Sequence, residues 1–258
     1  MSTESSRTAL ARRLRALHVP GDPLVLPNVW DCASAHAVAD AGFPVVATGS
    51  AAVALVLGYE DEEGTPAHEM LAAVARIARA VSVPVTADME RGYGLAPVEL
   101  AERLAATGAV GCNLEDTDHR TGQLAGPDEQ AAYIARLRAA DPDLVINART
   151  DCLLHGGARP AERLADTAYR ARAYLEAGAD CVYPIGALDE PTVEAVVEAV
   201  GGRPVNVLSL PGGPTPARLA ELGVARISFG DQLHRLVQGY LAGLVTAVAR
   251  GDRPSAGG

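Results

Sequence analysis

Short apolar runs alternate along the chain with longer segments in which apolar residues recur every three or four positions. Most of the short runs are continuously apolar, which is typical of strands buried on both faces of a parallel sheet. The longer segments, such as 67–81 and 160–178, have the period of an amphipathic helix, and Gly or Pro stands at almost every junction. Eight runs have the strand pattern, and they begin at Leu24, Pro44, Pro84, Gly111, Leu144, Cys181, Pro204 and Arg226.

This alternation predicts the fold class. Eight strand–helix units in 258 residues are typical of an α/β protein built as one (β/α)8 TIM barrel. We expect a single domain over 1–258, with the barrel at about residues 24–250 and an amphipathic helix before Leu24 that caps the bottom of the barrel. A doubly wound open sheet is the alternative, but it more often carries G-x-G-x-x-G after its first strand, where this chain has Pro-Asn-Val-Trp-Asp.

Composition excludes several classes of protein. Hydrophobic residues make up 48% and charged residues 21% of the chain, which excludes disordered and fibrous classes. All 22 basic residues are arginine, so enzymes that need a lysine amine, such as Schiff-base aldolases, pyridoxal enzymes and P-loop proteins, are excluded. The net charge is −10 and the arginines are scattered, which argues against nucleic acid as a partner.

The cysteines and the N-terminal segment predict the compartment. The four cysteines form no C-x-x-C pair, so we expect buried reduced thiols in place of a zinc cluster or a disulfide frame. The first residues lack the apolar core of a signal peptide, and no apolar run is long enough to span a bilayer. The sequence therefore predicts a cytoplasmic protein without a membrane partner.

Acidic residues follow three neighbouring strands of the expected barrel, at the ends where barrel enzymes carry their active sites. Asp88 and Glu90 close the third strand, Glu115 ends the fourth, and Asp61 follows the second. Asp88 and Glu90 are two apart, so we expect them to share one face of the strand, where their charges repel unless a cation lies between them. Oxygen ligands without clustered histidines favour Mg²⁺ or Mn²⁺. The alternative is that the acids cap the following helices.

Polar groups at other strand ends suit an anionic ligand. Arg149 follows a buried run, so we expect it to need an anionic partner, either the metal's carboxylates or a substrate carboxylate; a purely structural salt bridge is the alternative. Asn206 on the seventh strand is a neutral donor that could hold a carboxylate. After the second strand, Gly49, Ser50 and Ala51 are small residues whose backbone amides could face an oxyanion.

Four motifs at four successive strand ends carry a family resemblance, and they read ATGSAAVALVLGYED, TADMERGYG, NLED and NARTD. In this order, over Leu26 to Leu244, the chain resembles the isocitrate lyase/phosphoenolpyruvate mutase superfamily. The resemblance implies a Mg²⁺-dependent (β/α)8 barrel that makes or breaks C–C or P–C bonds next to a 2-oxo acid, through a metal-bound enolate.

The resemblance also implies roles for these residues. Asp88 matches the acid nearest the metal, and Asp61, Glu90 and Glu115 match the remaining acidic shell, which acts partly through water. Arg149 matches an arginine that neutralises developing charge. The stretch of Gly49, Ser50 and Ala51 matches the backbone that holds a substrate carboxylate or enolate oxygen, and Asn206 matches an asparagine of the lyase branch.

The chain departs from the family pattern in two places. The third strand reads D-M-E where the family often has D-A-D, so Glu90 replaces an aspartate. The loop 117–123 has neither the cysteine of the lyases' K-K-C-G-H loop nor the lysine and asparagine of the phosphonopyruvate branch's P-K-x-N loop. The remaining resemblance is to a shorter branch with oxaloacetate decarboxylase-like and methylisocitrate lyase-like members. In this loop, His119 and Arg120 are the residues that could donate a proton or hold a remote carboxylate; a solvated loop histidine is the alternative.

These observations predict a Mg²⁺-dependent lyase that cleaves a C–C bond of, or decarboxylates, a small 2-oxo or 2-hydroxy acid. P–C chemistry on phosphonopyruvate and a non-catalytic barrel are the alternatives. The last helix, 232–251, is apolar over more than one stripe. One stripe can pack on the barrel, so we expect the remaining apolar side chains to be buried against another surface. Because the superfamily commonly exchanges this helix between subunits, the resemblance implies a homo-oligomer, a tetramer or a dimer. The alternative is a helix that folds back onto its own barrel.

Overall fold

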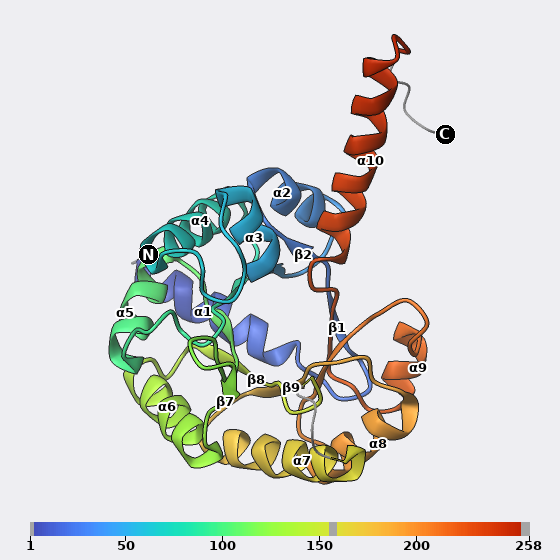
Figure 1. Ribbon diagram of the computed structural model, residues 1–258. Coiled ribbons are helices and arrows are strands. Elements are labelled where there is room, and N and C mark those ends of the chain that lie inside the picture. Colours follow the sequence, from blue (N-terminus) through green and yellow to red (C-terminus); the bar gives the residue numbers. More distant parts are fainter. Residues whose placement is uncertain (1–2, 155–158, 254–258) are drawn as a thin grey trace.

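The computed structural model describes residues 3–154 and 159–253 and shows a ring of helices around parallel strands (Figure 1). The strands fall into two parallel sheets. The larger sheet runs in the order β2 (Asn28–Val29), β3 (Val46–Thr48), β4 (Val85–Asp88), β5 (Gly111–Leu114), β8 (Val145–Thr150) and β9 (Cys181–Pro184). The smaller sheet runs in the order β1 (Leu24–Leu26), β11 (Arg226–Ser228) and β10 (Asn206–Leu208).

The two sheets join into one ring. A parallel bridge between Val182 and Val205 connects β9 to the start of β10. On the other side, β1 and β2 are two parts of one segment that Pro27 interrupts, because proline has no N–H for the ladder. Counting β1 and β2 together, the described strands form eight positions around the ring, in the order that the sequence predicts. The (β/α)8 prediction is confirmed, and the open-sheet alternative is wrong.

Helices cover the outside of the ring because each buries one apolar stripe against the strands. In α4 (Ala67–Ala80), for example, the buried positions recur at helical spacing and are Met70, Leu71, Ala73, Val74 and Ile77. The short α3 (Ser50–Leu57) and the hairpin of β6 (Thr117–Asp118) and β7 (Gln123–Leu124) are additions at the mouth. The other covering helices are α2 (Cys32–Asp40), α4 (Ala67–Ala80), α5 (Pro97–Thr107), α6 (Pro127–Ala140), α7 (Pro160–Glu176), α8 (Glu190–Ala199) and α9 (Pro216–Glu221).

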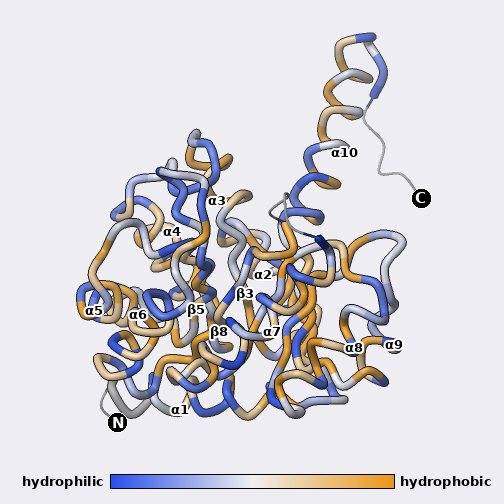
Figure 2. The backbone as a smooth tube through the Cα atoms, turned by 60° about the horizontal axis from the view of Figure 1, so that its bottom comes forward, coloured by the Kyte–Doolittle hydropathy of each residue, from blue (hydrophilic) through white to orange (hydrophobic). Residues whose placement is uncertain are grey.

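Helix α1 (Thr3–Ala16) closes the bottom of the barrel, as the sequence predicts (Figure 2). Its buried Ala11 and Leu14 pack in one cluster with Leu24 and Leu26 of β1. A Cβ on Gly111 would lie only 2.7 Å from Leu14 Cδ2, so the glycine makes room for this plug. Arg15 adds an ion pair, with its Nε 2.7 Å from Asp180 Oδ1.

Helix α10 (Gln232–Ala249) projects away from the barrel in both views (Figures 1 and 2). Among its described residues only His234 is buried, and that ring packs edge-on against Trp30 with centroids 4.9 Å apart. The exposed apolar side chains of α10 are Leu236, Val237, Tyr240, Leu241, Val245 and Val248. Within the described residues, no helix is long and apolar enough to cross a membrane.

Candidate active site

Two adjoining cavities open at the carboxyl ends of the strands, with volumes of about 300 and 270 Å³. Ser50, Asp61 and Arg149 line both, so the two cavities form one site. Glu90, Glu115, His119 and Asp151 line the first cavity. The second cavity is lined by Gly49, Ala51, Asp88, Asn113, Tyr183 and Ser228, among others. The structure thus brings together nearly all of the residues that the sequence singles out.

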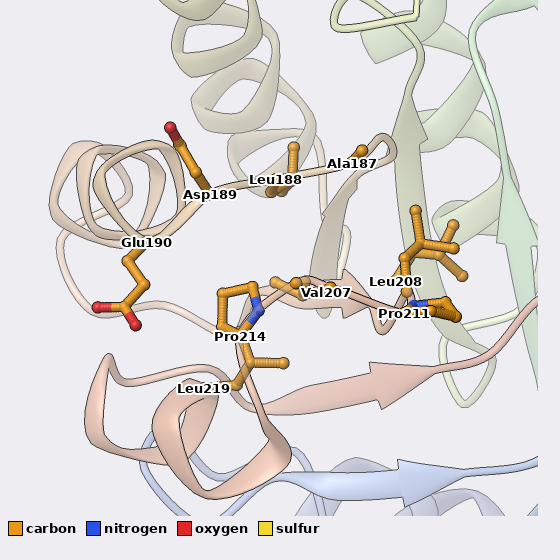
Figure 3. Close-up of a pocket in the computed structure, with 12 residues that line it drawn as sticks. Ala187, Leu188, Asp189, Glu190, Val207, Leu208, Pro211, Pro214 and Leu219 are labelled. Carbon is orange, nitrogen blue, oxygen red and sulfur yellow. The ribbon is translucent and has the colours of Figure 1, made fainter.

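A larger cavity of about 490 Å³ lies between the loops that follow β9 and β10 (Figure 3). Its walls are mostly apolar, and both of its carboxylates are engaged elsewhere. Asp189 accepts a hydrogen bond from the Thr192 amide at the start of α8, at 3.0 Å, and Glu190 pairs with Arg218 at 2.9 Å. The cavity therefore lacks free groups for acid–base or metal chemistry, and the smaller pair of cavities is the better candidate site.

Asp88 lies at the end of β4 and faces the start of α3 (Ser50–Leu57). Its Oδ2 accepts from the Ser50 amide at 3.2 Å and from the Ser50 hydroxyl at 3.1 Å. Its Oδ1 is buried and has no hydrogen-bond partner among the described residues. The amide of Gly49 donates to the Val29 carbonyl at 3.1 Å. The expected role of the Gly49 and Ser50 amides as oxyanion donors is thus not the arrangement seen here, because both amides already have acceptors.

Glu90 reaches the site by a different route from the one expected. Strand β4 ends at Asp88, and Glu90 lies beyond it with φ +45°, so the two acids do not share a strand face. Glu90 accepts from the Tyr93 hydroxyl and from the Glu63 amide, both at 2.5 Å. Burial, and then the charges of Asp61, Asp88 and Glu115, raise the pKa of Glu90 to about 8 despite the Tyr93 hydrogen bond.

The backbone around this acid is strained. Within the described chain, the non-glycine residues with positive φ are Glu62, Glu63, Glu90 and Tyr93, at 63°, 61°, 45° and 55°. All of them lie in the two loops that hold Glu90. Left-handed conformations cost free energy for residues with a Cβ and gather at functional sites, so this strain supports a functional role for the loops.

Glu115 links the hairpin to the strands. Its Oε1 lies 2.6 Å from His119 Nε2, and its Oε2 lies 2.5 Å from Arg149 Nη1. The His119 side chain is only 10% exposed, so the alternative of a solvated loop histidine is wrong. Burial disfavours the protonated ring, but the hydrogen bond and charge of Glu115 and the charges of Glu90 and Glu63 outweigh it and raise the pKa of His119 to about 9. Arg120 lies in the exposed part of the hairpin and pairs with Asp118 at 3.2 Å.

Asp151 holds Arg149 from the other side, and sequence reasoning missed it. Arg149 Nε and Nη2 donate to the two carboxylate oxygens of Asp151 at 2.6 and 3.1 Å. The amide of Asp151 in turn donates to the buried Asp116, at 2.9 Å, whose other oxygen accepts from the Tyr174 hydroxyl at 2.7 Å. The signal was present in the sequence, because Asp151 follows Arg149 by only two positions and comes directly after the end of β8.

Asn206 does not reach the cavity. It is fully buried, pairs in register with Arg226 on β11, and lies one layer below the lining residues Leu208 and Ser228. Its Oδ1 accepts from the Ser228 hydroxyl at 3.3 Å. Its side chain points into the barrel interior, two residues before the position on β10 that lines the cavity. The structure therefore does not bring Asn206 to the expected substrate position.

The carboxylates of the site, together with His119, offer ligand atoms for a divalent cation. Glu90, Glu115 and His119 each offer a ligand atom within 4.8 Å of the others. Asp61 faces Ser50 and Asp88, and burial and then the Asp88 charge raise the pKa of Asp61. A cation among these carboxylates would relieve their repulsion and would give the unpartnered Asp88 Oδ1 a partner. The donor set therefore fits a hard cation better than it fits helix capping.

Comparison with known proteins agrees with this geometry. The family model for phosphoenolpyruvate phosphomutase matches residues 14–249. The chain belongs to this family. Its structure is similar to that of a putative phosphonomutase from Burkholderia cenocepacia, with a TM-score of 0.86 and 43% identity over 92% of this chain and 98% of that one.

Other proteins that are similar to this chain have different names. An oxaloacetate decarboxylase from Rhodopseudomonas palustris is 33% identical over 86% of this chain and 77% of its own. The structure of 2,3-dimethylmalate lyase, described as a member of the PEP mutase/isocitrate lyase superfamily, matches with a TM-score of 0.82 and 27% identity, over 93% of this chain and 87% of that one. The superfamily resemblance found in the motifs is thus confirmed, and the similar proteins include a putative phosphonomutase, an oxaloacetate decarboxylase and a lyase.

Proposed function

We propose that this member of the phosphoenolpyruvate phosphomutase family is a Mg²⁺-dependent carbon–carbon lyase, acting on a small 2-oxo or 2-hydroxy diacid by cleavage or decarboxylation. The observation that carries the proposal is the clustering of Asp61, Asp88, Glu90 and Glu115 with Arg149 around the two adjoining cavities at the strand ends. The similarity to an oxaloacetate decarboxylase and to 2,3-dimethylmalate lyase supports it.

Asp88 and Glu115, with Asp61 and Glu90 around them, are the residues that would hold Mg²⁺. When bound, Mg²⁺ supplies a Lewis acid that polarises the 2-oxo group of the substrate. Manganese suits the same oxygen ligands. The unpartnered Oδ1 of Asp88 is the strongest single indication that this carboxylate is a ligand.

Arg149 and His119 then supply the chain's own contributions. Glu115 and Asp151 fix Arg149 from both sides, so its guanidinium is already oriented to stabilise the negative charge that develops on the substrate. His119, whose pKa the neighbouring Glu115 raises, can give its Nε2 proton to the carbon that loses its bond, and in this role it is a proton donor and not a metal ligand. This role replaces the loop cysteine that the chain lacks.

A substrate screen tests the proposal. Purified protein with Mg²⁺ is incubated with oxaloacetate, with alkyl-substituted malates and with phosphonopyruvate, and 2-oxo acid consumption or formation is followed, with EDTA as the control. We expect turnover of a carboxylate substrate that EDTA abolishes. Turnover of phosphonopyruvate alone would establish the P–C alternative, which the similarity to a putative phosphonomutase favours. No turnover of any of these substrates above the rate without protein would favour a non-catalytic barrel.

We further propose that the protein is a homo-oligomer, a dimer or a tetramer, assembled through α10. The apolar side chains of this helix, such as Leu236, Tyr240 and Val245, are exposed along its projecting length. Exposed apolar surface of this kind favours burial against another subunit.

A further inference from the structure

The barrel layer directly beneath the site is polar, although barrel interiors are mostly filled with Val, Ile and Leu. Four residues make up much of this layer because each precedes a cavity-lining residue by two positions and therefore shares its strand face. Every one of them is buried and has a side-chain polar atom without a hydrogen-bond partner among the described residues. They are Thr86, Asn147, Asn206 and Arg226, which precede Asp88, Arg149, Leu208 and Ser228.

Arg226 is the charged member of this layer. It is 1% exposed, and its Nη2 donates to Asn113 Oδ1 at 2.9 Å. Its Nε and Nη1 have no hydrogen-bond partner in the described part of the chain, and the ion pairs found there do not include it. A buried guanidinium without a paired carboxylate is costly, and arginine does not escape the cost by losing its proton. Because this charge is neither paired nor screened by water, it acts strongly on other charged groups near it.

The charge of Arg226 acts on the site above it as well as on His18 below it. Burial raises the pKa of Cys112, Cys181 and Tyr183, which face Arg226, to about 12, so they are neutral at neutral pH. The carboxylate whose charge acts most on Arg226 is that of Asp88. Asn113 connects the two, because it accepts the Arg226 hydrogen bond, pairs in register with Asp88 and lines the same cavity.

We propose that Arg226 is a second cation of the site, acting from beneath through Asn113. It strengthens the binding of an anionic 2-oxo acid in the mouth and weakens the binding of the divalent cation held by Asp88. Arg226 does not touch the substrate, so it is a positioning residue for charge and not a catalytic one. The inference rests on the proposed function in one respect, which is that a divalent cation and an anionic ligand share this cavity.

Replacing Arg226 by methionine tests the proposal, because the side chain keeps much of its bulk and loses its charge. Calorimetry measures the Kd of Mg²⁺ for the protein and the Kd of oxalate at saturating Mg²⁺. For Arg226→Met we expect tighter Mg²⁺ binding and weaker oxalate binding, each by on the order of tenfold for a unit charge in a buried setting. Damage to the structure would weaken both, so opposite shifts identify a field effect.

Two variants serve as controls. Thr86→Val changes the same layer without changing charge, and we expect both affinities to stay within about twofold of the parent values. Arg226→Lys keeps the charge and should stay closer to the parent protein than Arg226→Met does. If Arg226→Met does not fold, Arg226→Gln removes the charge and keeps hydrogen-bond donors, and the same opposite shifts are expected.

The outcomes separate this inference from the proposed function. Opposite shifts in a protein that turns over no 2-oxo acid support the role of Arg226 and overturn the lyase. Turnover with both affinities unchanged, or both weakened, in the charge-removing variants supports the lyase and overturns the role of Arg226. A parent protein that binds neither Mg²⁺ nor oxalate overturns both.

Discussion

Arg149 Nη1 lies 2.5 Å from Glu115 Oε2 at the buried end of the cavity. Asp151 accepts hydrogen bonds from Nε and Nη2 of the same guanidinium, so the Arg149 side chain bridges two carboxylates. The single ammonium group of a lysine could not bridge both. This fixed orientation is the basis for the first prediction.

We expect Arg149→Lys to lower kcat by on the order of 100- to 1,000-fold, because lysine keeps the charge but loses the planar fork. Steady-state kinetics on the substrate found in the screen measures the effect, and a melting temperature close to that of the parent protein shows that the fold is kept. A variant with most of its turnover would assign Arg149 a structural role.

Asp88→Ala should abolish Mg²⁺ binding and activity while leaving the fold intact. The Asp88 carboxylate contacts Ser50 and lines the cavity, and it joins no ion pair among the described residues, so its removal costs the barrel little. Calorimetry with Mg²⁺ gives the answer. Asp118→Ala is the matched control, because that acid lies in the hairpin, pairs with Arg120 and does not line the cavity. Parent-like Mg²⁺ affinity in Asp88→Ala would contradict the proposed ligand set.

His18, at the end of the plugging helix, should make the protein less stable in acid. Burial and the charge of Arg226 lower the pKa of His18 from 6.5 to about 4. Between these values the unfolded chain binds the proton and the folded chain does not, so the free energy of unfolding falls as the pH drops. The shift corresponds to about 3 kcal/mol at about pH 4.

The comparison with His18→Asn isolates this contribution. Asparagine can still donate to the Leu14 carbonyl, which His18 Nδ1 contacts at 2.9 Å, but it does not titrate. Urea unfolding at about pH 7 and about pH 4 should show the parent protein losing about 3 kcal/mol more than the variant does. Equal losses would mean that His18 is not held neutral.

Helix α10 should control assembly. Light scattering at micromolar concentration is expected to give a mass of two or four chains of 26.6 kDa. Leu236→Glu combined with Leu241→Glu places charge on exposed apolar positions and should give monomers, with helix content by circular dichroism unchanged. A parent protein that is already monomeric would show that α10 does not join subunits.

The fold could be predicted from the sequence because short, continuously apolar runs between amphipathic helices are typical of strands buried in a parallel sheet. All eight predicted runs contain strands, from β1 at Leu24 to β11 at Arg226. The same rule located most of the site, since polar residues that directly follow buried strands must lie at the mouth.

The remaining details depend on contacts that no local pattern encodes. Glu90 reaches the site through a left-handed backbone beyond the strand, and the amide of Ser50 is used by a carboxylate 38 positions away. His234 is buried because Trp30, from the other end of the chain, covers it. The sequence predicts a strand at Arg226, but its burial without an ionic partner in the described part of the chain follows from the polar layer that four strands build together.

The closure of the ring has a consequence for how the protein is made. Asn28 Oδ1 accepts from the amide of Phe229 at 2.9 Å, across a separation of 201 positions, and β1 pairs with β11 beside it. During synthesis one edge of β1 therefore stays unpaired until β11 has left the ribosome, when almost the whole chain has been made. Such long-range closure slows folding and leaves a growing half-barrel open to aggregation, so the nascent chain should depend on chaperones most just before its last strand emerges.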